Sequence, residues 1–175
     1  MKIRLLSLVF TVLTSVIFAQ DGWKTYQKDN YSINYPANWE YSDQKPQPSI
    51  DFILMSPEAS QTKDYFRENI NLTVENLVSE DLSLEEYTEK ALEQIKVQVP
   101  NAKMISALPV TIGDIEATNI IWSADFGGGL NLKFNQLFTV KDRVAYVLTF
   151  TSTTTEYELY EKDAIVMLNS FKFTK

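Results

Sequence analysis

Two neighbouring segments near the C-terminus alternate apolar and polar side chains over most of their length, with a predicted turn at Lys141-Asp142 between them. The apolar residues occupy even positions: Leu130, Leu132, Phe134, Phe138 and Val140, then Val144, Tyr146, Leu148 and Phe150. A period of two is typical of a half-buried β-strand. Strands joined by so short a turn pair antiparallel, because parallel neighbours need a crossover of about a dozen residues. The chain must therefore build an antiparallel sheet around this hairpin.

Shorter segments upstream have the same strand character. The predicted strands cover residues 31–35, 39–41, 50–55, 70–74, 108–112 and 115–123. Gly113-Asp114 is a turn pair that makes the last two an antiparallel hairpin. The polar stretches 42–49 and 58–64 are predicted loops, and the glycine run 127–129 is a predicted turn.

Two segments have helical periodicity. Ser83 with Glu86 three residues later forms a capping box, and apolar residues then recur at helical spacing until Pro100. Thr153 with Glu156 suggests a second capping box before a closing amphipathic helix.

The strand at 144–150 is apolar on both faces, because Ala145 and Val147 fill its odd positions. A strand that is buried on both faces needs cover on both sides of its sheet. We therefore expect an α+β fold in which helices sandwich a central antiparallel β-sheet.

The N-terminus has the pattern of a cleaved signal peptide. Lys2 and Arg4 precede a mainly apolar run over residues 5–18, and Ala19 supplies the small residue for cleavage before Gln20. The alternative is a membrane anchor, but the run is shorter than the roughly 20 residues that span a bilayer. We expect residues 1–19 to be a signal peptide, and the mature protein to be periplasmic or secreted without stable membrane insertion.

The mature chain is acidic and has the size of one domain. The full sequence of 175 residues has 16 Lys and Arg against 23 Asp and Glu, a net charge of −7. Loss of residues 1–19 removes two cations, so residues 20–175 have a net charge of −9. This charge argues against nucleic acid or an anionic membrane surface as the partner. One core suffices for residues 20–175.

The sequence contains no His and no Cys. It therefore has no Ser-His-Asp triad, no Cys nucleophile, no disulfide, no zinc site of ordinary ligands and no haem on its usual ligands. No cofactor, metal site or catalytic residue is predicted.

Acidic residues gather around the start of the first predicted helix. They are Glu75, Glu80, Asp81, Glu85, Glu86, Glu89 and Glu93. They suggest either a patch for calcium or a cationic partner, or a solvated face that favours the positive end of the helix dipole. The spacing of a calcium loop is missing. A glycosidase would need two carboxyls about 5 to 10 Å apart, which the sequence does not place.

Short motifs carry little functional information. Ser42 to Lys45 and Ser60 to Lys63 both read S-x-x-K, the pattern of a serine nucleophile with a lysine base, but both lie in predicted loops without companion motifs. Asp125-Phe126-Gly127 matches a kinase tripeptide, and we interpret it as a hairpin corner. Gly127 to Gly129 lacks the spacing and lysine of a phosphate loop.

Six aromatic residues lie between Trp23 and Tyr41. Such density suggests either a surface on which sugars stack or core packing. The strand alternation of Tyr31 and Tyr35 favours core packing.

Several of these segments together resemble the PsbP-like superfamily. The resemblance rests on Trp23, Tyr26, the run Tyr31-Ser-Ile-Asn-Tyr-Pro-Ala-Asn-Trp39, the run Phe66-Arg-Glu-Asn-Ile-Asn-Leu-Thr-Val74, the hairpin 138–150, and Ser170-Phe171-Lys172. It implies an α/β/α PsbP-like sandwich over nearly the whole mature chain. The superfamily includes a photosystem subunit, a Ran-binding nuclear-import factor and exported bacterial DcrB-like proteins, so it implies an interaction module rather than an enzyme. Metal-binding residues of the plant branch include histidines, which this chain lacks.

We therefore expect an exported, non-catalytic accessory module that binds a protein or cell-envelope component. The alternative is a small-ligand carrier for a lipid or sugar, with a pocket lined by aromatics between sheet and helix. A carboxylate-dependent hydrolase is the third class considered. Ala19 and Gln20, the processing residues, are the only site residues predicted. The oligomeric state is left open.

Overall fold

A computed structural model describes residues 22–174 except 29, 63–64 and 79. The predicted signal peptide, with Ala19 and Gln20, lies outside the described residues. The strands are β1 (Trp23–Lys28), β2 (Tyr31–Pro36), β3 (Glu40–Ser42), β4 (Ile50–Met55), β5 (Asn69–Asn76), β6 (Lys103–Ile112), β7 (Ile115–Asp125), β8 (Asn131–Lys141), β9 (Val144–Thr153) and β10 (Lys172–Phe173). The helices are η1 (Glu58–Thr62), α1 (Leu84–Gln98) and α2 (Tyr157–Asn169).

The predicted antiparallel sheet is confirmed. Seven strands form it in the order β3-β4-β5-β9-β8-β7-β6, and every described strand pair is antiparallel. A second sheet, in the order β1-β2-β10, brings both ends of the described chain together, since Lys172 of β10 pairs with Ser32 of β2. The sequence pattern did not predict this second sheet, because β10 is too short to show a period.

The turn between β8 and β9 lies one residue later than predicted. Lys141 pairs with Val144, so the turn residues are Asp142 and Arg143, which have φ angles of 51° and 62°. Positive φ at both positions defines the type I′ turn, whose twist matches that of paired strands. This register sets Leu137 of β8 opposite Leu148 of β9. The even residues of the two strands therefore face opposite sides of the sheet.

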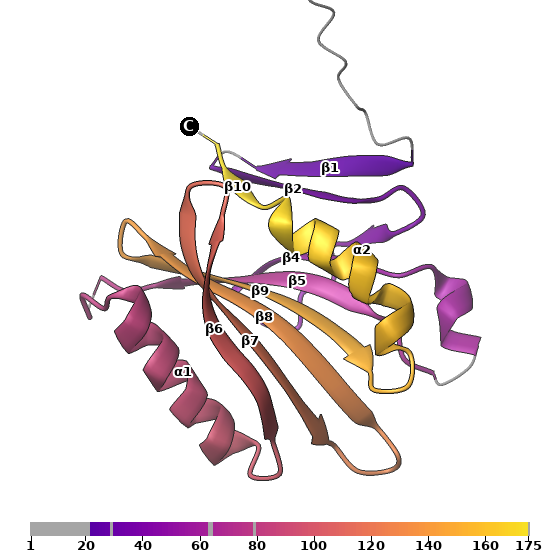
Figure 1. Ribbon diagram of the computed structural model, residues 1–175. Coiled ribbons are helices and arrows are strands. Elements are labelled where there is room, and N and C mark those ends of the chain that lie inside the picture. The colour runs from indigo at the N-terminus through magenta and orange to yellow at the C-terminus, as the bar shows by residue number, and fades with distance from the viewer. Residues whose placement is uncertain (1–21, 29, 63–64, 79, 175) are drawn as a thin grey trace, which may run out of the picture.

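The sheet packs a separate core cluster on each face. Leu148 and Phe150 belong to the cluster that contains Met167 and Leu168 of α2, whereas Val147 belongs to the cluster that α1 covers. Figure 1 shows α1 at the lower left of the sheet, and α2 at the upper right beside β1 and β2. On the α2 face, cover comes from one helix together with the three-stranded sheet. The predicted sandwich of one central sheet between helices is therefore not confirmed, because the described residues form two antiparallel sheets with the helices α1 and α2.

Local predictions for the helix starts had mixed outcomes. The Ser83 capping box is confirmed, since the Ser83 hydroxyl accepts from the Glu86 backbone N–H and the Glu86 carboxylate accepts from the Ser83 N–H. The second capping box is wrong, because the N-cap position of α2 is Glu156, which has a helical conformation and makes no side-chain cap hydrogen bond. The predicted loop at 58–64 is also wrong in part, because η1 occupies Glu58–Thr62.

The aromatic opening packs mainly in the core, as predicted. Tyr31 is 1% exposed and Trp39 is 2% exposed, with the Trp39 ring edge-on to Tyr160 of α2 at 6.3 Å between centroids. Tyr41 differs, because it is 45% exposed and stacks on Tyr26. Trp39 therefore anchors α2 and does not offer a platform for sugars.

Candidate functional site: the edge strand β6 and its groove

A groove of about 820 Å³ runs between the first turns of α1 and the edge of the large sheet. Leu84, Glu85, Thr88 and Glu89 form the helix wall. Ala107, Pro109 and Thr111 of β6, with Glu116 and Thr118 of β7, form the sheet wall. A hydrogen bond of 3.3 Å joins the hydroxyls of Thr88 and Thr118 at the base and holds the helix against the strand.

The groove borders a strand with one unpaired side. β6 is the last strand in the sheet order, and no described strand pairs with its outer side. Gly113, with φ of 61°, starts a two-residue turn that makes Ile112 and Ile115 a directly facing pair. Since hydrogen-bonded and non-hydrogen-bonded pairs alternate from such a turn, the backbone groups of Ala107, Pro109 and Thr111 point away from β7.

Pro109 agrees with this assignment. Proline has no N–H, and within sheets it is tolerated where that group would face outward at an edge. The outer side of β6 therefore presents N–H groups at Ala107 and Thr111, with a carbonyl at Pro109 between them. These are the groups that pair with an added strand.

Apolar side chains lie beside these backbone groups. Met104 is 40% exposed, Ile105 is 56% exposed and Leu108 is 59% exposed. A bulge between Met104 and Ser106 interrupts the regular pairing with β7 at this point. The edge strand thus combines unpaired backbone with exposed apolar area, which is typical of a surface that binds another chain.

The groove walls are negatively charged. Glu85 and Glu89 are exposed on α1, and Glu116 is exposed on β7 opposite Thr111. The groove lining includes no basic residue. A pocket therefore lies between sheet and helix, but acidic, hydroxyl and aliphatic side chains line it instead of aromatics.

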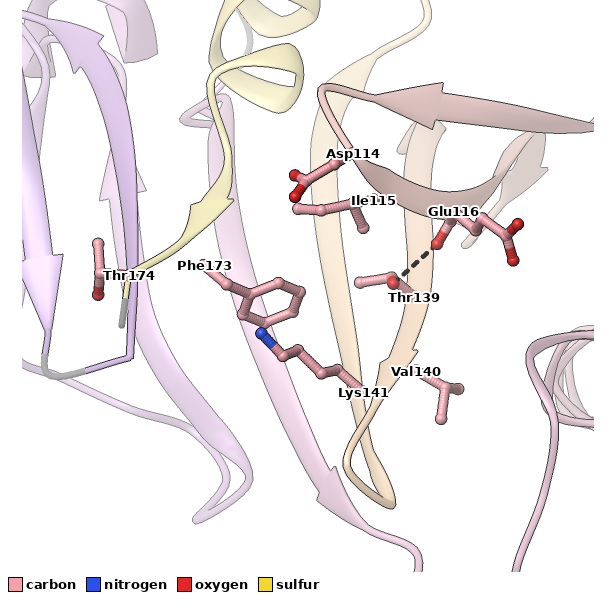
Figure 2. A pocket seen from close by; sticks show the side chains of 8 residues that line it. All are labelled: Asp114, Ile115, Glu116, Thr139, Val140, Lys141, Phe173 and Thr174. Atoms are coloured by element: carbon pink, nitrogen blue, oxygen red, sulfur yellow. Dashed lines mark hydrogen bonds between the residues drawn. The ribbon is translucent and has the colours of Figure 1, made fainter.

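A second cavity of about 580 Å³ lies between the turn of β6 and β7 and the C-terminal strand (Figure 2). Asp114, Thr139 and Lys141 line it on the sheet side, and Phe173 lines it from β10. The Lys141 ammonium lies 4.4 Å from the centre of the Phe173 ring, a cation–π contact. Figure 2 shows the Glu116 carboxylate turned away from this cavity. We therefore assign this carboxylate to the groove beside α1, which Glu116 also lines.

Most of the predicted acidic cluster has protein partners. Glu80 pairs with Lys90, and Asp81 Oδ1 lies 2.9 Å from Arg143 Nε. Glu86 belongs to the helix cap, and its hydrogen bonds from Ser83 lower its pKa. Only Glu85 and Glu89 of the cluster reach the groove. Over the described residues, no group of three or more Asp or Glu is placed to hold a metal ion.

The short motifs do not form reactive pairs among the described residues. The Ser42 hydroxyl accepts from the Gln44 N–H at 3.2 Å, while Lys45 lies 3.9 Å from Asp51. The Ser60 hydroxyl bonds that of Ser56, and Lys63 lies outside the described residues. Asp125 accepts from the Gly127 N–H at 2.8 Å, which confirms the hairpin corner.

The groove was missed at the sequence level. Its strand was predicted, but strand order decides which strand is at an edge, and that order depends on long-range pairing. The available signal was Pro109 within a strand pattern, since proline is confined to edges and bulges.

The family model described as "PsbP-like protein" matches residues 18–173. The chain belongs to the PsbP-like family. The solution structure of cyanobacterial PsbP (CyanoP) from Synechocystis sp. PCC 6803 is similar, with a TM-score of 0.64 and 11% identity over 87% of this chain and 93% of that chain. The comparison with curated proteins found no match.

Two further structures are similar to this PsbP-like protein. LpqN, involved in cell envelope biogenesis of Mycobacterium tuberculosis, has a TM-score of 0.64 and 13% identity, covering 89% of this chain and 94% of that one. PA94 from Pseudomonas aeruginosa, of unknown function, has a TM-score of 0.57 and 18% identity, covering 82% and 94%. These identities show a shared fold. In the described part of the chain, no helix is long and apolar enough to cross a membrane.

Proposed function

We propose that this PsbP-like protein is an exported, non-catalytic binding module that captures a protein partner along β6 and the adjoining groove. The observation that carries the proposal is the edge strand itself. Over Ala107 to Thr111 it presents outward backbone groups, and Leu108 beside them is 59% exposed. A partner segment that pairs here would satisfy the backbone and bury this apolar area.

Export is supported by the N-terminal pattern, in which Lys2 and Arg4 precede an apolar run and Ala19. The similarity to LpqN, a protein involved in cell envelope biogenesis, agrees with a periplasmic or secreted location. The lack of His and Cys supports a non-catalytic role, because it removes the commonest general base and the most reactive nucleophile.

Site-specific photo-crosslinking in cells tests the proposal. A photoreactive residue at Leu108 should yield one or a few discrete adducts. The same residue at Leu159, which is 67% exposed on α2, is the matched control and should yield none of them. Identical products at both positions, or none at Leu108, would overturn capture along β6.

A second candidate function, a small-ligand carrier, is favoured by the cavity in Figure 2. Lys141 offers a cation and Phe173 a flat ring, a combination suited to a ligand with an anionic group and an apolar body. Native mass spectrometry of protein purified from the envelope should then show a bound small molecule. Lys141→Ala should lose it, and detection of bare protein alone would rule this candidate out.

A further inference from the structure

We infer that the segment captured by β6 is a basic, extended stretch of a partner protein, whose Lys or Arg side chains enter the groove between α1 and β7. This inference rests on the proposed function, since it names the chemistry of the chain that the edge strand would pair with.

The charge of the groove carries the inference. Glu85 and Glu89 are four residues apart on α1, hence on one face of the helix, and Glu116 lines the same groove from the sheet wall. None of the three forms a salt bridge within the described residues. Three unpaired carboxylates around one groove attract a cationic partner and repel an acidic one.

The spacing of the carboxylates suits a strand. Four residues of α-helix rise about 6 Å, which separates Glu85 from Glu89 along the axis. Alternate residues of a strand are about 6.7 Å apart, and they point to the same face. A strand added to β6 would therefore place every second side chain over the groove, at nearly the interval of the two carboxylates.

A second copy of this chain is a poor occupant by the same reasoning. Pairing between two β6 edges would bring together the acidic grooves of two molecules that each have a net charge of −7 over the full sequence. A positively charged partner meets no such repulsion.

Fluorescence anisotropy with labelled ten-residue peptides tests the inference on the purified protein. The probe alternates Lys and Val. Its controls are a peptide with five Lys followed by five Val, and alternating Glu-Val and Ser-Val peptides. We expect the alternating basic peptide to bind more tightly than all three controls. Its binding should weaken in 0.5 M NaCl because salt screens exposed charges.

Variants locate the site. The double variant Glu85→Gln with Glu89→Gln should weaken peptide binding about tenfold, because the loss of each exposed ion pair should raise the Kd about threefold. Glu158→Gln, an exposed change on α2, is the matched control and should leave binding unchanged. Ala107→Pro removes one outward N–H and should abolish binding. Ala107→Lys, which places a cation in the groove, gives a second test if the proline variant does not fold.

The outcomes separate the two proposals. Equal binding of the Glu-Val or Ser-Val peptide, lost in Ala107→Pro, would overturn the basic partner and leave capture along β6 intact. An equal loss in Glu158→Gln would show diffuse charge attraction and overturn the groove as the site. Binding of no peptide would overturn the inference, while crosslinking at Leu108 would decide the proposed function separately. Dimerisation through β6 in sedimentation experiments would replace the partner with a second copy.

Discussion

The Tyr87 hydroxyl of α1 donates a hydrogen bond of 2.9 Å to the Glu75 carboxylate at the end of β5. Tyr87 is 8% exposed, and its ring packs edge-on against Phe138 of β8. Burial raises the pKa of the Tyr87 hydroxyl, and the negative charge of Glu75 raises it further. Tyr87 therefore joins α1 to β5 through a hydrogen bond that only the protonated phenol can donate.

The first prediction is a loss of stability at alkaline pH that depends on Tyr87. Its pKa is higher in the folded state than the value of about 10 in the unfolded chain. The unfolded state therefore releases the proton first, and the free energy of unfolding falls as pH rises above about 10. Urea melts at pH 8 and pH 10.5 measure this loss.

Tyr87→Phe is the matched variant for this effect. It should cost about 1 kcal/mol at pH 8 through the lost hydrogen bond. It should also show a smaller fall in stability between the two pH values than the wild type. Equal falls in both proteins would contradict the assignment, because other tyrosines would then account for the whole effect.

The second prediction concerns Trp39. Trp39→Ala should destabilise the protein by about 3 to 5 kcal/mol, the usual cost of deleting a buried large aromatic. Leu159→Ala, at a side chain that is 67% exposed, should change stability by less than about 0.5 kcal/mol. Denaturant melts at pH 7 compare the two, and a near-neutral Trp39→Ala would argue for a surface role.

The third prediction concerns the turn between β8 and β9. Arg143 has φ of 62°, a conformation that glycine adopts without the steric cost of a Cβ. Arg143→Gly should therefore raise the Tm by about 2 °C, measured by calorimetry. Asp81→Asn removes the ion pair to Arg143 without changing the turn, and it should not raise the Tm. A lower Tm for Arg143→Gly would show that its side-chain contacts outweigh the backbone strain.

The fourth prediction concerns processing. Cleavage after Ala19 should leave a mature protein that begins at Gln20 and is recovered outside the cytoplasm. N-terminal sequencing of protein from the native host determines the first residue. Replacing Ala19 with a bulky residue such as Leu should slow cleavage, and an intact Met1 in the cytoplasmic fraction would refute export.

Local chemistry in the sequence determined the elements. The alternation in 130–140 and 144–150 predicted β8 and β9 because the strand period is set by backbone geometry and needs no knowledge of neighbours. Ser83 and Glu86 predicted the start of α1, since a capping box involves only side-chain and backbone groups within one helical turn. Thr153 failed as a cap because β9 continues through it, and pairing with Leu132 of β8 competes with the local signal.

Tertiary structure alone decided which strand is at an edge and which face each side chain occupies. A type I′ turn at Asp142 and Arg143 sets an even residue of β8 opposite an odd residue of β9, so identical sequence patterns face opposite cores. β6 became the free edge because β7 pairs with β8 on its other side. Glu85 and Glu116, which are 31 positions apart in sequence, meet across a groove only when α1 packs on that face. Contacts of this kind form when elements distant in sequence pack together, and no local sequence period relates the residues that make them.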